Sequence, residues 1–170
     1  MATLRLRVDP PKIPLHVVLV EPEIPQNTGS IARMTAATCA RLHLVGRLGF
    51  RIDEKSVRRA GVDYWHLVDL QQHPDLPHLA HALPPDRWLL FSATASRSYL
   101  DAPYEPGSAL VFGRESTGLP PDLLERHPER VYGIPTSGAV RSLNLSNAVG
   151  IVLFEALRAT GALASPRLAP

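Results

Sequence analysis

Cysteines, metal-binding motifs and long apolar runs are scarce in this sequence. The single cysteine, Cys39, excludes an internal disulfide, and no spacing of Cys and His matches a metal site. No apolar run reaches the roughly 18 residues that span a bilayer, and the glycine patterns of dinucleotide-binding and Walker loops are missing. We therefore expect a cytoplasmic protein that uses no metal, does not enter a membrane and is not a Rossmann-type redox enzyme.

Net charge is also small, because 18 Lys and Arg oppose 16 Asp and Glu and leave +2. Nucleic-acid binding would therefore depend on local clustering of charge. Residues 41–59 contain six basic side chains against two acidic ones, Asp53 and Glu54; the basic residues are Arg41, Arg47, Arg51, Lys55, Arg58 and Arg59. We interpret this stretch as a contact for RNA phosphates, with a solvated charged surface as the alternative. Tyr64, just beyond it, could stack on an unpaired base.

A length of 170 residues with 45% hydrophobic content predicts one compact domain. Prolines near the start predict a mobile arm over residues 1–14, and residues 161–170 are expected to form a flexible tail. The folded domain should then cover residues 15–160. Short β-branched or apolar runs predict buried parallel strands, at residues 15–21, 42–45, 88–93, 109–112 and 131–134.

Helical patterns lie between these strands. Asn27 or Thr28 is a candidate cap for one helix, residues 53–60 and 74–82 could form two more, and a wide apolar stripe from Leu145 onward predicts the last. The alternation predicts an α/β fold with a mainly parallel sheet covered by helices on both faces. Ligands of such sheets bind in the loops at the carboxyl ends of the strands.

Three polar strings, the first two of which contain glycine, fall in such loops. PQNTGSIAR follows the first predicted strand, FGRESTGLP overlaps the end of the 109–112 strand, and RSLNLSNAV opens the last helix. Glycines permit close approach of the backbone to a ligand, and helix starts expose N–H groups. The last helix needs one cap but has several candidates, so surplus polar groups are available for a ligand. Ordinary capped turns are the alternative at each loop.

In this order and spacing, the three strings resemble the motifs of the SpoU-type RNA 2′-O-methyltransferases of the SPOUT superfamily. The short chain is most similar to the branch that methylates the wobble nucleotide of tRNA. The resemblance covers nearly the whole folded region, including KSVRRAGVDYW. It implies a C-terminal trefoil knot, S-adenosylmethionine as methyl donor, and a homodimer with the active site at its interface.

The resemblance also implies site residues. Those expected to bind the methyl donor are Ala93, Gly113, Ile134, Ser142 and Leu143. Those that fall on catalytic positions are Asn27, Arg33, Glu115 and Asn144. An extra arginine, Arg114, stands where relatives often have proline, and we expect it either to contact phosphate or to pair with Glu115.

The implied reaction transfers a methyl group to the ribose 2′-OH of position 34, a cytidine or modified uridine, in the anticodon loop. Arg33 is the family's usual candidate for activating that hydroxyl. A guanidinium stays protonated far above neutral pH and is a poor base, so we favour a role in holding phosphate and stabilising the ribose oxygen. Two other hypotheses remain: methylation of another tRNA or rRNA site, and a non-enzymatic RNA-binding relative.

Overall fold

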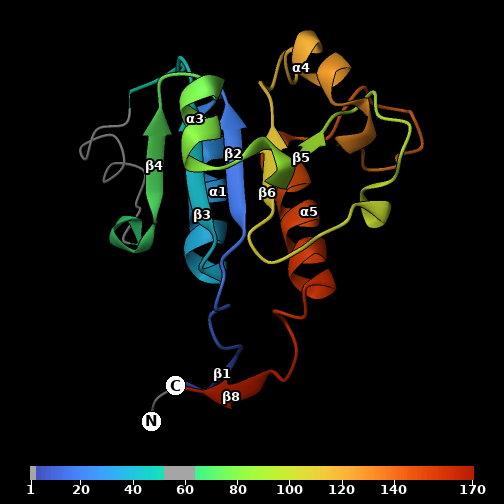
Figure 1. The fold of residues 1–170 in the computed structure, drawn as a ribbon. Helices are drawn as coiled ribbons and strands as arrows, with labels where there is room; N and C mark the ends of the chain where they lie inside the picture. The colour runs from blue at the N-terminus through green and yellow to red at the C-terminus, as the bar shows by residue number, and fades with distance from the viewer. Residues whose placement is uncertain (1–2, 52–63) are drawn as a thin grey trace.

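The computed structural model describes residues 3–51 and 64–170 and is built around a six-stranded sheet in which every pairing is parallel (Figure 1). In spatial order its strands are β4 (Leu70–His73), β3 (Arg41–Val45), β2 (His16–Val20), β6 (Ala109–Phe112), β5 (Trp88–Phe91) and β7 (Val131–Tyr132). The predicted α/β class and parallel sheet are confirmed.

Helices cover both faces of this sheet because side chains of each strand alternate between two apolar clusters. The helices are α1 (Pro25–Thr38), α3 (Leu76–Ala82), α4 (Pro121–Arg126) and α5 (Leu145–Ala159). Leu19 packs in the cluster that includes Ile31 of α1 and Leu153 of α5. Its neighbour Val18 faces the opposite cluster, which includes Leu79 of α3. Short 3-10 turns lie in the connections: η1 (Trp65–Leu67), η2 (Pro85–Arg87), η3 (Tyr99–Asp101) and η4 (Pro128–Arg130).

The start of α1 differs from the expectation that Asn27 or Thr28 would cap it. The helix begins at Pro25, after the N-cap residue Ile24, and no side chain of the cap residue makes a capping bond. Proline fits the first helical position because its missing N–H would have no helical partner there. The capping prediction was wrong since Asn27 lies inside the first turn, where its side chain serves the site described below.

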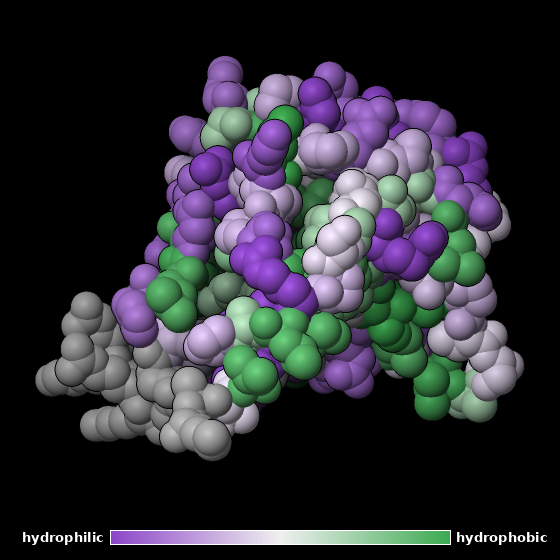
Figure 2. All heavy atoms as spheres, turned by 90° about the horizontal axis from the view of Figure 1, so that it is seen from below, coloured by the Kyte–Doolittle hydropathy of each residue, from purple (hydrophilic) through white to green (hydrophobic). Residues whose placement is uncertain are grey.

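The two ends of the chain pair with each other. β1 (Arg5–Arg7) and β8 (Arg167–Ala169) form an antiparallel ribbon, with Leu6 opposite Leu168. The ribbon lies below the amino-terminal edge of the large sheet in Figure 1. Figure 2 views the molecule from this side and shows hydrophobic patches among hydrophilic residues. Each of the expected mobile ends thus contributes a strand, and their mobility stays a prediction.

Three imidazoles form a hydrogen-bonded row across β2, β3 and β4. His16 Nδ1 lies 2.9 Å from His43 Nε2, and His43 Nδ1 lies 3.0 Å from His73 Nε2. His43 is buried, and this burial together with the neighbouring imidazoles lowers its pKa to about 3. The row is therefore uncharged at neutral pH, with one proton shared in each N–H···N contact.

Candidate active site

A pocket opens at the carboxyl ends of β5, β6 and β7, where the strand order of a parallel sheet predicts ligand binding. Its volume is about 560 Å³, within the range of small-molecule sites. All five residues expected to bind a methyl donor line this pocket: Ala93, Gly113, Ile134, Ser142 and Leu143. Three of the four expected catalytic residues, Asn27, Glu115 and Asn144, line it as well.

The loop after β6 forms one wall, and its glycines determine its shape. Arg114 and Gly118 exchange two backbone hydrogen bonds, of 3.1 and 2.9 Å, which closes a tight turn. Gly118 has a φ of +75°, in the left-handed region that favours glycine. At Gly113 an added Cβ would lie 2.0 Å from the carbonyl carbon of Gly118. The strand end and the turn therefore touch backbone to backbone, a contact that only glycine at position 113 permits.

Glu115, at the tip of that turn, joins it to the loop that precedes α1. Its Oε2 accepts a hydrogen bond from the backbone N of Glu23 at 2.8 Å. Its Oε1 accepts from the backbone N of Ile24 at 3.2 Å and from Asn27 Nδ2 at 3.0 Å. A carboxylate from 91 residues away thus supplies acceptors at the start of α1, where negative charge is favourable.

Asn27 carries this network on to α5. It is buried, with 6% of its surface exposed, and its Oδ1 accepts a hydrogen bond from Asn144 Nδ2 at 3.0 Å. Asn144 is the N-cap of α5, since its Oδ1 accepts from the backbone N of Ser146 and of Asn147. One row of three polar side chains therefore ties the three loops of the pocket together.

A second set of polar contacts links the loop before α1 to the loop after β6. Glu23 accepts hydrogen bonds at 2.9 Å from both the hydroxyl and the backbone N of Ser116, and these bonds lower the pKa of its carboxyl. Arg114 binds the carboxylate of Glu21, which raises the pKa of the guanidinium. Of the two roles expected for Arg114, pairing with Glu115 was wrong, because Glu115 turns toward the start of α1. Phosphate contact stays a prediction.

Comparison with known proteins gives the family. The sequence model of the SpoU rRNA Methylase family matches residues 14–154. The chain belongs to this family. A tRNA (cytidine(34)-2'-O)-methyltransferase of Burkholderia pseudomallei (strain 1106a) is 46% identical over 149 residues, covering 86% of this chain and 96% of that protein. The enzyme of the same name from Acidovorax sp. (strain JS42) is 43% identical over 154 residues, covering 89% of this chain and 95% of that protein.

Solved SpoU structures share this architecture. One that concerns the 2-OH methylation of C/U34 on tRNA has a TM-score of 0.80 and 45% identity, covering 86% of this chain and 95% of that chain. The SpoU methyltransferase AviRb from Streptomyces viridochromogenes, in complex with AdoMet, has a TM-score of 0.73 and 25% identity. That comparison covers 90% of this chain and 60% of the other. The predicted family is confirmed.

Arg33, the fourth expected catalytic residue of this SpoU chain, is not among the described residues that line the pocket. Its side chain is exposed on α1, and its Cζ lies 4.5 Å from the ring centroid of Tyr64. Asn27 lies six positions earlier on the same helix, which places the two on different faces at 100° per residue. Asn27 therefore lines the pocket from one face of α1, while Arg33 projects from another face of the same helix.

The basic stretch predicted to contact RNA is only partly described. Lys55, Arg58 and Arg59 lie outside the described residues. Arg51 is exposed, whereas Arg41 opens β3 at the amino-terminal edge of the sheet and pairs with Asp69 at 2.9 Å. Arg41 thus lies at the opposite end of its strand from the pocket.

Sequence reasoning missed Arg141 as a pocket residue, although it stands directly before the RSLNLSNAV motif's serine. Its guanidinium donates to the backbone O of Ser116 at 3.2 Å, across the mouth of the pocket. The arginine that opens the motif was the available signal.

Within residues 3–51 and 64–170, no group of three His, Cys, Asp or Glu side chains is arranged to hold a metal ion. No helix in these ranges has the length and apolar character needed to cross a membrane.

Proposed function

We propose that this protein transfers a methyl group from S-adenosylmethionine to the ribose 2′-OH of nucleotide 34, a cytidine or modified uridine, in tRNA anticodon loops. The observation that carries the proposal is the convergence of three loops, joined through Glu115, Asn27 and Asn144, on one pocket. The named activity of relatives 43–46% identical to the chain supports the choice of substrate.

The pocket residues fit the methyl donor. Backbone groups and small side chains form much of the lining, and Gly113 leaves no room for a Cβ, so the wall is shaped by main chain. S-adenosylmethionine supplies an electrophilic methyl group on a sulfonium. Ala93, Gly113, Ile134, Ser142 and Leu143 would hold it, and the AdoMet complex of AviRb supports this assignment.

The side chains of the network act by positioning. Each oxygen of Glu115 is engaged by N–H donors of the loop before α1, so its carboxylate holds that loop against the turn after β6. Asn27 and Asn144 hold the start of α5 in the same arrangement. Such pre-organisation keeps the acceptor hydroxyl and the methyl donor aligned, which is the main requirement of an in-line displacement.

Arg33 has the chemistry to bind the phosphate beside the target ribose and to stabilise negative charge on its 2′ oxygen. Its high pKa makes it an unsuitable proton acceptor at neutral pH. We assign it this electrostatic role rather than that of a base.

We propose that the enzyme is a homodimer in which Arg33 of one subunit serves the pocket of the other. α1 presents Arg33 on the side away from its own pocket, and α5 exposes two large apolar side chains, Ile151 and Phe154. These side chains offer an apolar surface on α5 for a second copy of the chain. We also propose the family's trefoil knot at the carboxyl end of the domain and a cytoplasmic location; likeness to SpoU structures supports the knot.

The tRNA surface of this proposal includes Arg51 and Tyr64 together with Lys55, Arg58 and Arg59. Arg41 opens β3, at the end of that strand opposite the pocket. It would contact the tRNA only if the bound RNA extended along the whole strand.

The test is to incubate the purified protein with total tRNA and labelled S-adenosylmethionine, and to map the label by mass spectrometry. The proposal expects a single 2′-O-methyl group at position 34. Label at another tRNA position, or only in ribosomal RNA, would move the activity to another substrate, and absence of any transfer would leave an RNA-binding protein without catalysis.

A further inference from the structure

Tyr64 occupies an unusual place beside α1. Its hydroxyl donates a hydrogen bond to the backbone O of Gly29 at 3.1 Å, and its ring lies beneath the guanidinium of Arg33. Gly29 and Arg33 are four positions apart, so they lie on one face of the helix. The ring thus spans one turn of α1, fastened at one end and in contact with a cation at the other.

The backbone of Tyr64 is also held. It is the N-cap of η1, and its carbonyl accepts a hydrogen bond from the backbone N of Leu67 at 2.9 Å. Two residues of the same segment, Trp65 and Val68, pack against the main apolar cluster. The ring therefore belongs to a fixed segment, although Tyr64 itself is only half-buried.

We propose that Tyr64 is the positioning residue for Arg33, holding its guanidinium over the ring so that its N–H edge faces the RNA phosphate. This inference rests on the proposed methyl transfer. A cation over an aromatic ring is attracted through the ring face. The N–H donors of any planar guanidinium lie along its edge, and that edge forms bidentate contacts with phosphate. A long side chain held in one orientation also loses less conformational freedom when the RNA binds.

This role differs from base stacking, which the sequence suggested for Tyr64. One ring face is in contact with Arg33, so the tyrosine acts on the substrate through the arginine. The stacking hypothesis remains a prediction for the other face.

The experiment compares Tyr64→Leu, which removes the ring, with Tyr64→Phe, which keeps the ring and removes the hydroxyl. Single-turnover methyl transfer is measured at saturating tRNA, and donor affinity by calorimetry. Loss of a partly exposed cation–π contact predicts a rate about 3- to 30-fold lower for Tyr64→Leu. Tyr64→Phe should stay within about twofold of the parent. Donor affinity should be unchanged in both, because Tyr64 does not line the pocket.

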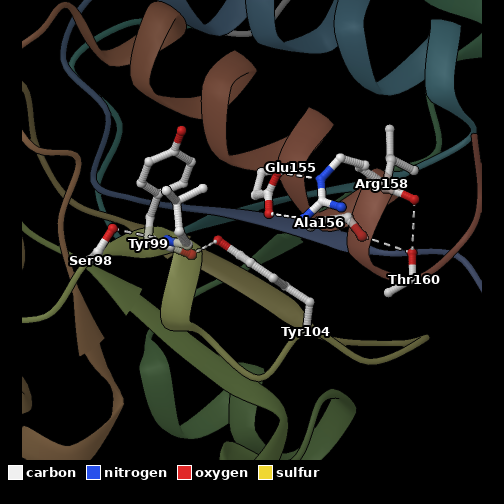
Figure 3. A network of polar contacts seen from close by, with 9 residues as sticks. Ser98, Tyr99, Tyr104, Glu155, Ala156, Arg158 and Thr160 are labelled. Carbon is white, nitrogen blue, oxygen red and sulfur yellow. Dashed lines mark hydrogen bonds and ion pairs between the residues drawn. The ribbon is translucent and has the colours of Figure 1, made fainter.

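Tyr104 offers a matched control for both substitutions. Its hydroxyl also donates to a backbone carbonyl, that of Tyr99 at 2.6 Å, in a loop beside the carboxyl-terminal half of α5 (Figure 3). Tyr104→Phe and Tyr104→Leu should leave the transfer rate unchanged even if they lower the melting temperature. A slower rate in these variants equal to that of Tyr64→Leu would show a general loss of structure and overturn the inference.

Two further readouts separate positioning from stability. In an Arg33→Ala background, Tyr64→Leu should cause no additional loss of rate, whereas a purely structural tyrosine would cost the same factor again. In NMR spectra, the Arg33 side-chain protons should show an upfield ring-current shift that Tyr64→Phe preserves and Tyr64→Leu abolishes. A shift that persists in Tyr64→Leu contradicts the inference, whatever the activity. If the parent protein transfers no methyl group, the proposed function fails while the NMR comparison still decides the role of Tyr64.

Discussion

Asn27 connects the loops that form the pocket, and its replacement by alanine removes two partly buried hydrogen bonds. One is a charge-assisted bond of 3.0 Å to Glu115 and the other a neutral bond of 3.0 Å from Asn144. Such bonds contribute about 1.5–3 and 0.5–1.5 kcal/mol. Asn27→Ala should therefore lower the unfolding free energy by about 2–4 kcal/mol, and the melting temperature by roughly 5–15 °C.

Asn27→Asp gives a sharper test because it turns the attractive contact with Glu115 into a repulsive one. An oxygen in place of Nδ2 would sit about 3.0 Å from Glu115 Oε1, so that two carboxylates face each other. The pKa of one of them should rise in the folded state, because like charges disfavour ionisation. Stability associated with a raised pKa is present at low pH and lost as the pH rises. Asn27→Asp should thus be less stable than Asn27→Ala at pH 7 and approach it near pH 5.

Urea unfolding of both variants between pH 7 and pH 5, with calorimetric titration of S-adenosylmethionine, measures these effects. Asn147→Ala is the matched control, because Asn147 is exposed and its bond to Asn144 uses only its backbone N. We expect weaker donor binding for both Asn27 variants and parent-like binding for the control. Equal stability of the aspartate and alanine variants at pH 7 would refute the geometry of the network.

Three other perturbations test separate parts of the structure. The pKa of His43 is lowered to about 3, so below pH 6.5 the unfolded chain binds more protons than the folded chain. The free energy of unfolding should therefore fall by about 2 kcal/mol from pH 6.5 to 5. In urea titrations His43→Leu should flatten this pH dependence, and an unchanged dependence would contradict the lowered pKa of His43. Gly113→Ala places a Cβ 2.0 Å from backbone, so it should lower the free energy of unfolding by about 3 kcal/mol or more and abolish donor binding. In the control Gly29→Ala the added Cβ has nothing within 4 Å, and the donor affinity measured by calorimetry should be unchanged. Normal donor binding by Gly113→Ala would contradict the backbone contact described for the loop after β6. Arg33→Ala should slow single-turnover methyl transfer by about 100-fold and retain donor affinity. The transfer rate of Arg33→Lys should lie between those of Arg33→Ala and the parent. Full activity of both variants would show that Arg33 has no role in the reaction.

The strands around the pocket could be predicted because their signal is local. The runs at residues 88–93, 109–112 and 131–134 contain β5, β6 and β7, since buried parallel strands are apolar on both faces. β4 escaped prediction because its sequence, LQQH, belongs to an edge strand that is only half-buried and has no apolar run. α4 is only 6 residues long, too short for helical periodicity to show.

The location of the site was predictable, while its internal contacts were not. Asn27, Glu115 and Asn144 each follow a strand or open a helix, so parallel topology brings them to one edge of the sheet. Their hydrogen bonds join residues 88 and 117 positions apart, and such pairings depend on tertiary packing. The same holds for Arg33, whose separation from the pocket follows from its angular position on a helix that starts earlier than the capping residues suggested.

The most direct test of the central claim, methyl transfer to the ribose hydroxyl of nucleotide 34, uses two otherwise identical tRNAs. One has ribose at position 34 and the other a 2′-deoxy nucleotide at that position alone. With labelled S-adenosylmethionine, the proposed enzyme should transfer one methyl group per molecule of the first tRNA and none to the second. Equal labelling of the two, or labelling of neither, would contradict the claim.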